Sequence, residues 1–199
     1  MTTKREAPQS ESLMGQLRED GTLVFERVLP GPIERVWAYL IDGDKRALWL
    51  AGGDMPVVPG ARGRMSFDIA GLARDVPPEK FAGADAPMVM DYEVVACEPP
   101  RRVRFTWPDA APEGEAPPAG AIGSEVEIEL TPEGPDVRLR LTHSGARYAR
   151  DGMIGLMAGW DSHLGLLQDT VNGAPPRPFW ATFAAAEVRH AERMASAGR

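Results

Sequence analysis

Cysteine, histidine and long apolar runs are scarce in this sequence. The 199 residues include one cysteine, Cys97, so no disulfide can form within the chain. The three histidines lie far apart, and no pair of His or Cys residues has the spacing of a zinc site. We therefore expect no metal and no other cofactor. A single thiol suits a reducing compartment, which we take to be the cytoplasm.

The chain also lacks a basic surface and a membrane signal. Lysine and arginine number 22 against 29 acidic residues, which gives a net charge of −7. Nucleic acids and anionic membranes attract basic surfaces, so neither is expected as a partner. No apolar run reaches the roughly 20 residues that cross a bilayer. Phosphate-binding glycine loops and the Gly-x-Ser-x-Gly element of hydrolases are missing as well.

Apolar side chains recur at every second position in the middle of the sequence, with charged residues between them. Residues 23–29 are expected to form an earlier, first strand. The alternating residues are Met65, Phe67 and Ile69; Met88, Met90, Tyr92 and Val94; Val103, Phe105 and Trp107; Val126, Ile128 and Leu130; and Val137, Leu139, Leu141 and His143. A period of two predicts antiparallel strands with one packed face and one wet face.

Helical spacing appears before and after these strands. Two short helices are expected over residues 33–40 and 44–49. A long C-terminal helix is predicted by one apolar stripe at 4-3-4-3-4 spacing: Met153, Met157, Trp160, Leu164, Leu167 and Val171. About 20 residues at roughly 1.5 Å each make a rod of about 30 Å, long enough to cross a sheet.

The pattern divides the chain into three parts. Residues 1–20 are expected to be a flexible tail, 21–174 the folded domain, and 175–199 a helical extension with a helix over 179–194. The aromatic residues of that extension would form an exposed apolar patch unless they pack on the domain or on a second copy. A homodimer through the extension is therefore one expectation. The loops at 71–87 and 108–123 are long for hairpin connections.

The order of elements resembles the START and birch-pollen-allergen-like (SRPBCC) superfamily of helix-grip domains. Within it, the sequence is most similar to proteins related to the activator of the heat-shock protein 90 ATPase. The resembling segments are RVLPGPIERVW at 27–37, WLAGG at 49–53, PGARG at 59–63, EPPRRV at 98–103, TW at 106–107, LTHSG at 141–145 and GW at 159–160. The resemblance implies an α+β helix-grip fold, a curved antiparallel sheet wrapped around a long C-terminal helix.

That resemblance also implies a ligand cavity between the sheet and the helix. The candidate lining residues are Met65, Phe67, Met90, Tyr92, Phe105, Trp107, His143, Met153, Met157 and Trp160. Such a cavity would suit a small apolar or aromatic molecule. For each of these residues, burial in an ordinary core is the simpler alternative.

His143 is the most informative polar residue, because strand alternation places it on the inner face. It could hydrogen-bond a ligand or transfer a proton. The alternative is a histidine whose nitrogens are satisfied within the protein. Tyr92, also on the inner face, needs a partner for its hydroxyl group if it is buried.

Three functions remain open at this point. The first is a non-catalytic binder of a small hydrophobic molecule. The second is a cofactor-free enzyme of the polyketide cyclase or dehydratase type, in which His143 and Tyr92 would supply acid and base. The third is a module that contacts a chaperone or regulator and has a filled interior. An empty, apolar space between the sheet and the helix would favour the binder, and an empty space on which His143 and Tyr92 converge would favour the enzyme. A filled space would favour the interaction module.

Overall fold

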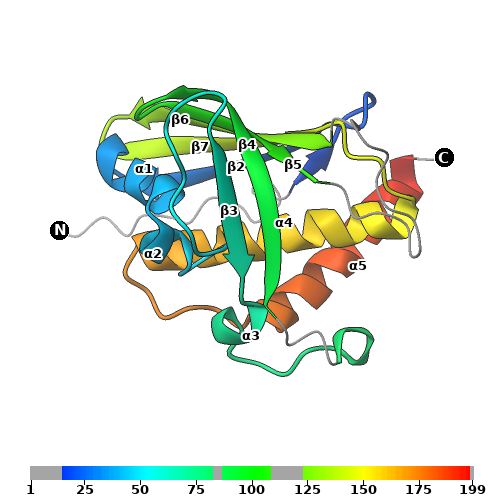
Figure 1. Ribbon diagram of the computed structural model, residues 1–199. Helices are drawn as coiled ribbons and strands as arrows, with labels where there is room; N and C mark the ends of the chain where they lie inside the picture. Colours follow the sequence, from blue (N-terminus) through cyan, green and yellow to red (C-terminus); the bar gives the residue numbers. More distant parts are fainter. Residues whose placement is uncertain (1–14, 83–86, 109–122, 198–199) are drawn as a thin grey trace.

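A computed structural model describes residues 15–82, 87–108 and 123–197, in which an antiparallel sheet curves around a long helix (Figure 1). The strands are β1 (Gln16–Leu17), β2 (Leu23–Pro30), β3 (Arg62–Phe67), β4 (Met88–Glu98), β5 (Arg102–Trp107), β6 (Ser124–Glu133) and β7 (Asp136–Ser144). They lie in the order β1-β2-β7-β6-β5-β4-β3, and every neighbouring pair is antiparallel. The predicted fold class is confirmed.

The alternation of the central strands holds in the structure. Along β6 the side chains of Val126, Ile128 and Leu130 are buried, while the glutamates between them point the other way. On the outer face, Glu127 lies 3.4 Å from Arg102 of β5. Pairs of this kind are solvated and stabilise little, so the free energy of the sheet comes mainly from its inner face.

Two local expectations were wrong. Ile69 does not continue β3, because Asp68 ends the strand and its carboxylate accepts a hydrogen bond from the Gly71 amide at 2.9 Å. That cap begins the short helix α3 (Ile69–Leu72). Residues 16 and 17, expected within a loose tail, pair with the start of β2 as strand β1. The rest of that tail, residues 1–14, and residues 109–122 of the second long loop lie outside the described residues.

The remaining helices are α1 (Ile33–Ile41), α2 (Gly43–Arg46), α4 (Arg150–Val171), α5 (Phe179–Ala197) and a 3₁₀ turn at Glu79–Phe81. Helix α4 has 22 residues, so it is about 33 Å long. It lies across the concave face of the sheet (Figure 1), and Trp160, Leu164 and Leu167 are buried there.

Helix α4 is buried on a second side as well. Ala158, Asp161 and Ser162 lie off the predicted stripe, and all three are buried. The cause is α5, which packs against α4 and buries Phe179 and Phe183 (Figure 1). Within the described residues, no helix is long and apolar enough to cross a membrane.

Candidate functional site: an aromatic cavity beside the long helix

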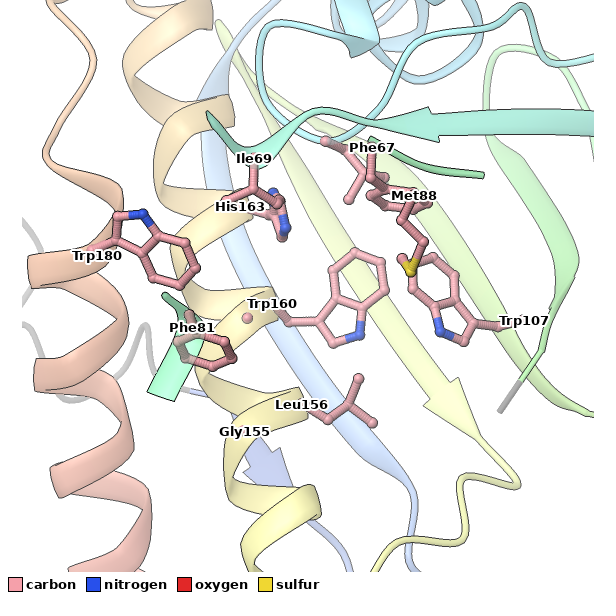
Figure 2. Close-up of a pocket in the computed structure, with 12 residues that line it drawn as sticks. Phe67, Ile69, Phe81, Met88, Trp107, Gly155, Leu156, Trp160, His163 and Trp180 are labelled. Carbon is pink, nitrogen blue, oxygen red and sulfur yellow. The ribbon is translucent and has the colours of Figure 1, made fainter. Parts of the chain in front are cut away.

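A cavity of about 420 Å³ lies between α4, α5 and the edge of the sheet where β3 ends and β4 begins. Figure 2 shows its lining, which comes from segments far apart in the sequence. The lining residues are Leu50, Phe67, Ile69, Phe81, Met88, Trp107, Gly155, Leu156, Gly159, Trp160, His163 and Trp180. Met88, one of these lining residues, is 59% exposed.

Aromatic rings form most of the walls. On the sheet side, the ring centres of Trp107 and Trp160 are 5.1 Å apart, and Phe67 meets Trp107 edge-on at 5.8 Å. On the opposite side, Phe81 and Trp180 stack at 5.0 Å. These contacts hold the rings in fixed positions.

Two glycines of α4 make room for this cavity. A Cβ atom built on Gly155 or on Gly159 would meet no heavy atom within 4 Å. Glycine inside a helix costs about 1 kcal/mol relative to alanine. Since the two glycines lie one turn apart on the cavity side, they leave a groove where side chains would otherwise fill the space.

The wall formed by Phe81 and Trp180 comes from two separate segments, the long loop at 71–87 (the insertion) and α5. Asp75 caps the start of α5, because its carboxylate oxygens accept hydrogen bonds from the Trp180 and Ala181 amides at 3.1 and 2.8 Å. Lys80 lies 2.6 Å from Glu187 of α5. The insertion after β3 and the C-terminal helix therefore hold one another in place.

His163 is the one titratable side chain among the lining residues of the described chain. Its Nδ1 lies 2.7 Å from the carbonyl oxygen of Trp49. A carbonyl only accepts, so Nδ1 carries the hydrogen and Nε2 carries a lone pair. Burial lowers the pKa of His163 to about 4, although the hydrogen bond to the Trp49 carbonyl acts in the opposite direction. At neutral pH the ring is uncharged.

The residue that orients His163 is itself fixed. The indole nitrogen of Trp49 donates to the carbonyl of Tyr39 at 2.8 Å. Arg46 is buried nearby and donates to the carbonyl of Leu40 at 2.9 Å. The loop after α1 thus presents the Trp49 carbonyl rigidly to His163.

From the sequence, His163 is expected beside the apolar stripe of α4, at the boundary of the packed face, and not in a ligand site. The available signal was its spacing, because a residue three positions after Trp160 lies on nearly the same face of a helix. A helix was predicted over 179–194, but no pattern in the sequence placed Phe81 or Trp180 beside α4.

Of the ten predicted lining residues, three line this cavity: Phe67, Trp107 and Trp160. Six others are buried in the core and are not among its lining residues, namely Met65, Met90, Tyr92, Phe105, Met153 and Met157. For these six, the structure favours the alternative of ordinary core packing. The cavity lies toward one side of α4, whereas the prediction spread it along the whole sheet.

His143 does not serve the cavity as a polar group, which corrects the expectation. The Trp160 indole nitrogen donates to its Nδ1 at 3.0 Å. Nε2 must then carry the hydrogen, and it lies 2.7 Å from the Ser124 hydroxyl oxygen. Both nitrogens are thus satisfied inside the protein, and burial lowers the pKa of His143 to about 4. Alternation correctly placed the residue inward, but these partners come from β6 and α4.

Tyr92 is also separate from the cavity. Its hydroxyl lies 3.4 Å from the carbonyl oxygen of Asp54, and its ring meets Phe105 edge-on. Burial raises the pKa of Tyr92. Tyr92 and His143 do not converge on the cavity as an acid–base pair would.

A buried charge cluster joins three elements on the other side of α4. Asp161 lies 2.7 Å from Arg27 of β2 and 2.7 Å from His190 of α5. The three residues are 7%, 3% and 1% exposed, respectively. Burial alone would raise the pKa of Asp161, but hydrogen bonds from His190 and Arg27 lower it overall. The sequence assigns no role to His190, and only the packing of α5 against α4 brings it to Asp161.

No group of three or more His, Cys, Asp or Glu side chains within residues 15–82, 87–108 and 123–197 is arranged to hold a metal ion.

Comparison with known proteins identifies the domain. The family described as Activator of Hsp90 ATPase homolog 1-like protein matches residues 30–172. The protein encoded by gene BPP1335 of Bordetella parapertussis, solved by NMR, is 42% identical over 95% of each chain, with a TM-score of 0.71. Protein MLL2253 of Mesorhizobium loti is 26% identical over 77% of this chain and 98% of its own, with a TM-score of 0.59. No curated protein matches.

A more distant structure shares the fold alone. CalU16 of Micromonospora echinospora is 19% identical over 90% of this chain and 93% of its own, with a TM-score of 0.57. Helix α5 lies beyond the residues that the family matches. The BPP1335 protein nevertheless aligns over nearly the full length of this chain.

Proposed function

This chain belongs to the Activator of Hsp90 ATPase homolog 1-like family, and we propose that this member binds a small, mostly apolar molecule with an aromatic ring. The observation that carries the proposal is the cavity of about 420 Å³. Small-molecule sites are typically about 300–1,000 Å³, mostly apolar, with few polar groups. This cavity has the size, the aromatic walls and a single imidazole.

The cost of keeping the cavity open supports the proposal. Two glycines inside α4 and a row of aromatic rings surround space that larger side chains would fill. Apolar wall surface left in contact with water costs about 25 cal/mol for each Å² relative to its burial. A ligand would recover part of that free energy.

A cofactor-free enzyme is the weaker candidate. General acid–base catalysis needs groups whose pKa values lie near the working pH. His163 is the one titratable lining residue, and its pKa of about 4 makes it a weak base. An interaction module with a filled interior is also weaker, because this interior has open space beside α4.

The test is to fill the cavity from the helix. Gly159→Leu places a branched side chain in the open space, and Gly159→Ala adds a single methyl group as the matched control. We would titrate both variants and the wild type with N-phenyl-1-naphthylamine, whose fluorescence rises in apolar surroundings. Wild type and Gly159→Ala should bind the dye, and Gly159→Leu should bind at least about tenfold more weakly, which is a loss of about 1.4 kcal/mol.

Thermal melting separates this effect from misfolding. Both alanine and leucine favour a helix more than glycine does, so neither substitution at Gly159 should lower the melting temperature. Equal binding by all three proteins would place the dye elsewhere and remove the support for the cavity. If Gly159→Leu weakens binding of the dye as expected, mass spectrometry of small molecules that co-purify with the native protein can identify the physiological ligand.

A homodimer through residues 175–199 stays a separate prediction. The aromatic residues that motivated it, Phe179 and Phe183, are buried against the same chain. Val188 of α5 is exposed and would belong to any such interface. Sedimentation velocity of the full chain measures the oligomeric state directly.

A further inference from the structure

We propose that the cavity selects neutral aromatic molecules that carry a hydrogen-bond donor, of which a phenol is the simplest, and that His163 Nε2 accepts that bond. The inference rests on the proposed function and assigns it a ligand class.

The direction of the hydrogen bond follows from the backbone. Nδ1 of His163 donates to the Trp49 carbonyl at 2.7 Å, which leaves Nε2 as an acceptor. Nε2 has no hydrogen-bond partner among the described residues. It is also absent from their fully buried, unpartnered side-chain atoms, so Nε2 keeps some accessible surface. Figure 2 shows the His163 ring between Ile69 and Trp160, among the cavity walls. The free acceptor therefore opens toward the space where a ligand would lie.

The other lining side chains offer no comparable acceptor. The indole N–H of Trp160 already donates to His143. The indoles of Trp107 and Trp180 can only donate, and Figure 2 shows Trp180 directing its six-membered ring, not its nitrogen, toward Phe81. An unmet acceptor in apolar surroundings costs free energy. A ligand that donates to His163 removes that cost, whereas a ligand without a donor does not.

Charge decides against carboxylates. The His163 ring is neutral at pH 7, since its pKa is about 4, so it offers a lone pair and no positive charge. The negative faces of the surrounding rings also disfavour an anion. Lys80 lies near this wall, but its ammonium is already 2.6 Å from both carboxylate oxygens of Glu187. A carboxylate would lose water without gaining a cation.

Three naphthalenes of similar size test the ligand class. At pH 7 we would measure binding of 2-naphthol, 2-methoxynaphthalene and 2-naphthoate to the full chain by calorimetry. The naphthol donates, the methyl ether can only accept, and the naphthoate is an anion. We expect 2-naphthol to bind about tenfold more tightly than the ether, the upper range for one hydrogen bond. The naphthoate should bind most weakly.

Substitution of the acceptor tests the residue. In His163→Phe the preference for 2-naphthol should disappear or reverse, because the ether is the more apolar compound. The control is His190→Phe, which removes a buried imidazole that bonds Asp161 and lies outside the cavity lining. It should keep the preference even if it lowers stability. The ratio of the two dissociation constants is the readout, so a partial loss of folded protein does not imitate the effect.

A spectroscopic measurement on the wild type removes dependence on the variants. With ¹⁵N-labelled histidine, the His163 Nε2 resonance should move when 2-naphthol is added and stay in place with 2-methoxynaphthalene. Equal affinities for the naphthol and the ether, or tightest binding of the naphthoate, would overturn the inference and leave the binding function intact. If none of the three compounds binds, both the inference and the proposed function fail.

Discussion

His143 and His163 are buried and uncharged, so the stability of this protein should depend on pH well above the range in which carboxylates titrate. Burial lowers the pKa of each to about 4 from its usual value near 6.5. Between these values the unfolded chain binds more protons than the folded one. The free energy of unfolding is therefore full above about pH 6.5 and falls as the pH drops toward 4.

The magnitude follows from the two pKa values. At pH 5 an unfolded histidine is almost fully protonated, while the folded one remains mostly neutral. Relative to pH 7, that difference costs about 2 kcal/mol for each histidine, since one pKa unit corresponds to about 1.4 kcal/mol. His143 and His163 together should remove about 4 kcal/mol, a large part of the roughly 5–15 kcal/mol that stabilises a typical domain.

Urea unfolding at pH 7 and pH 5 measures this loss for the wild type and for His143→Phe. The variant should be less stable at pH 7 by about 1–3 kcal/mol, because the Trp160 indole and the Ser124 hydroxyl lose a buried partner. Its loss between pH 7 and pH 5 should nevertheless be about 2 kcal/mol smaller than that of the wild type.

The decisive quantity is the loss of unfolding free energy between pH 7 and pH 5 in the wild type minus the same loss in His143→Phe. Groups that titrate alike in both proteins cancel in this subtraction. If the wild type and His143→Phe lose the same free energy between pH 7 and pH 5, His143 is protonated as readily in the folded state as in the unfolded one. Its hydrogen bonds to Trp160 and Ser124 would then not hold as described.

Three further substitutions probe the packing around α4. Trp160→Ala should cost about 3–5 kcal/mol in urea unfolding, as for a buried large-to-small change; a loss below about 1 kcal/mol would contradict the helix register. Asp161→Ala takes the carboxylate from buried Arg27 and should also cost about 3–5 kcal/mol; a neutral result would mean that the cluster is solvated. Lys80→Ala breaks an exposed pair with Glu187 and should cost less than about 1 kcal/mol; a larger loss would show that this pair holds α5 in place.

Strands and the register of α4 could be predicted because their signals are local and repeated. Along β7 every second side chain from Val137 to His143 is buried. On α4, the expectation that Trp160 faces the sheet is confirmed by its hydrogen bond to His143. In both cases the periodicity of one segment specifies which face is packed, whatever packs against it.

The cavity could not be predicted in the same way, since its walls meet only through tertiary contacts. Phe81 lies in the insertion and Trp180 in the extension, and neither segment has a period that relates it to the other. Gly155 and Gly159 fall outside the apolar stripe of α4, so the pattern gave them no role. Alternation placed His143 inward but could not show that Trp160 and Ser124 occupy both its nitrogens.

The cavity combines strands and a helix that the family matches with a helix that lies beyond that match. Strands β3 to β7 and α4 lie within the residues that the family matches, whereas β1, nearly all of β2 and α5 lie outside them. Trp180 comes from that added helix and stacks on Phe81 of the insertion. The insertion also supplies Asp75, which caps α5, so a change in either segment alters the same wall.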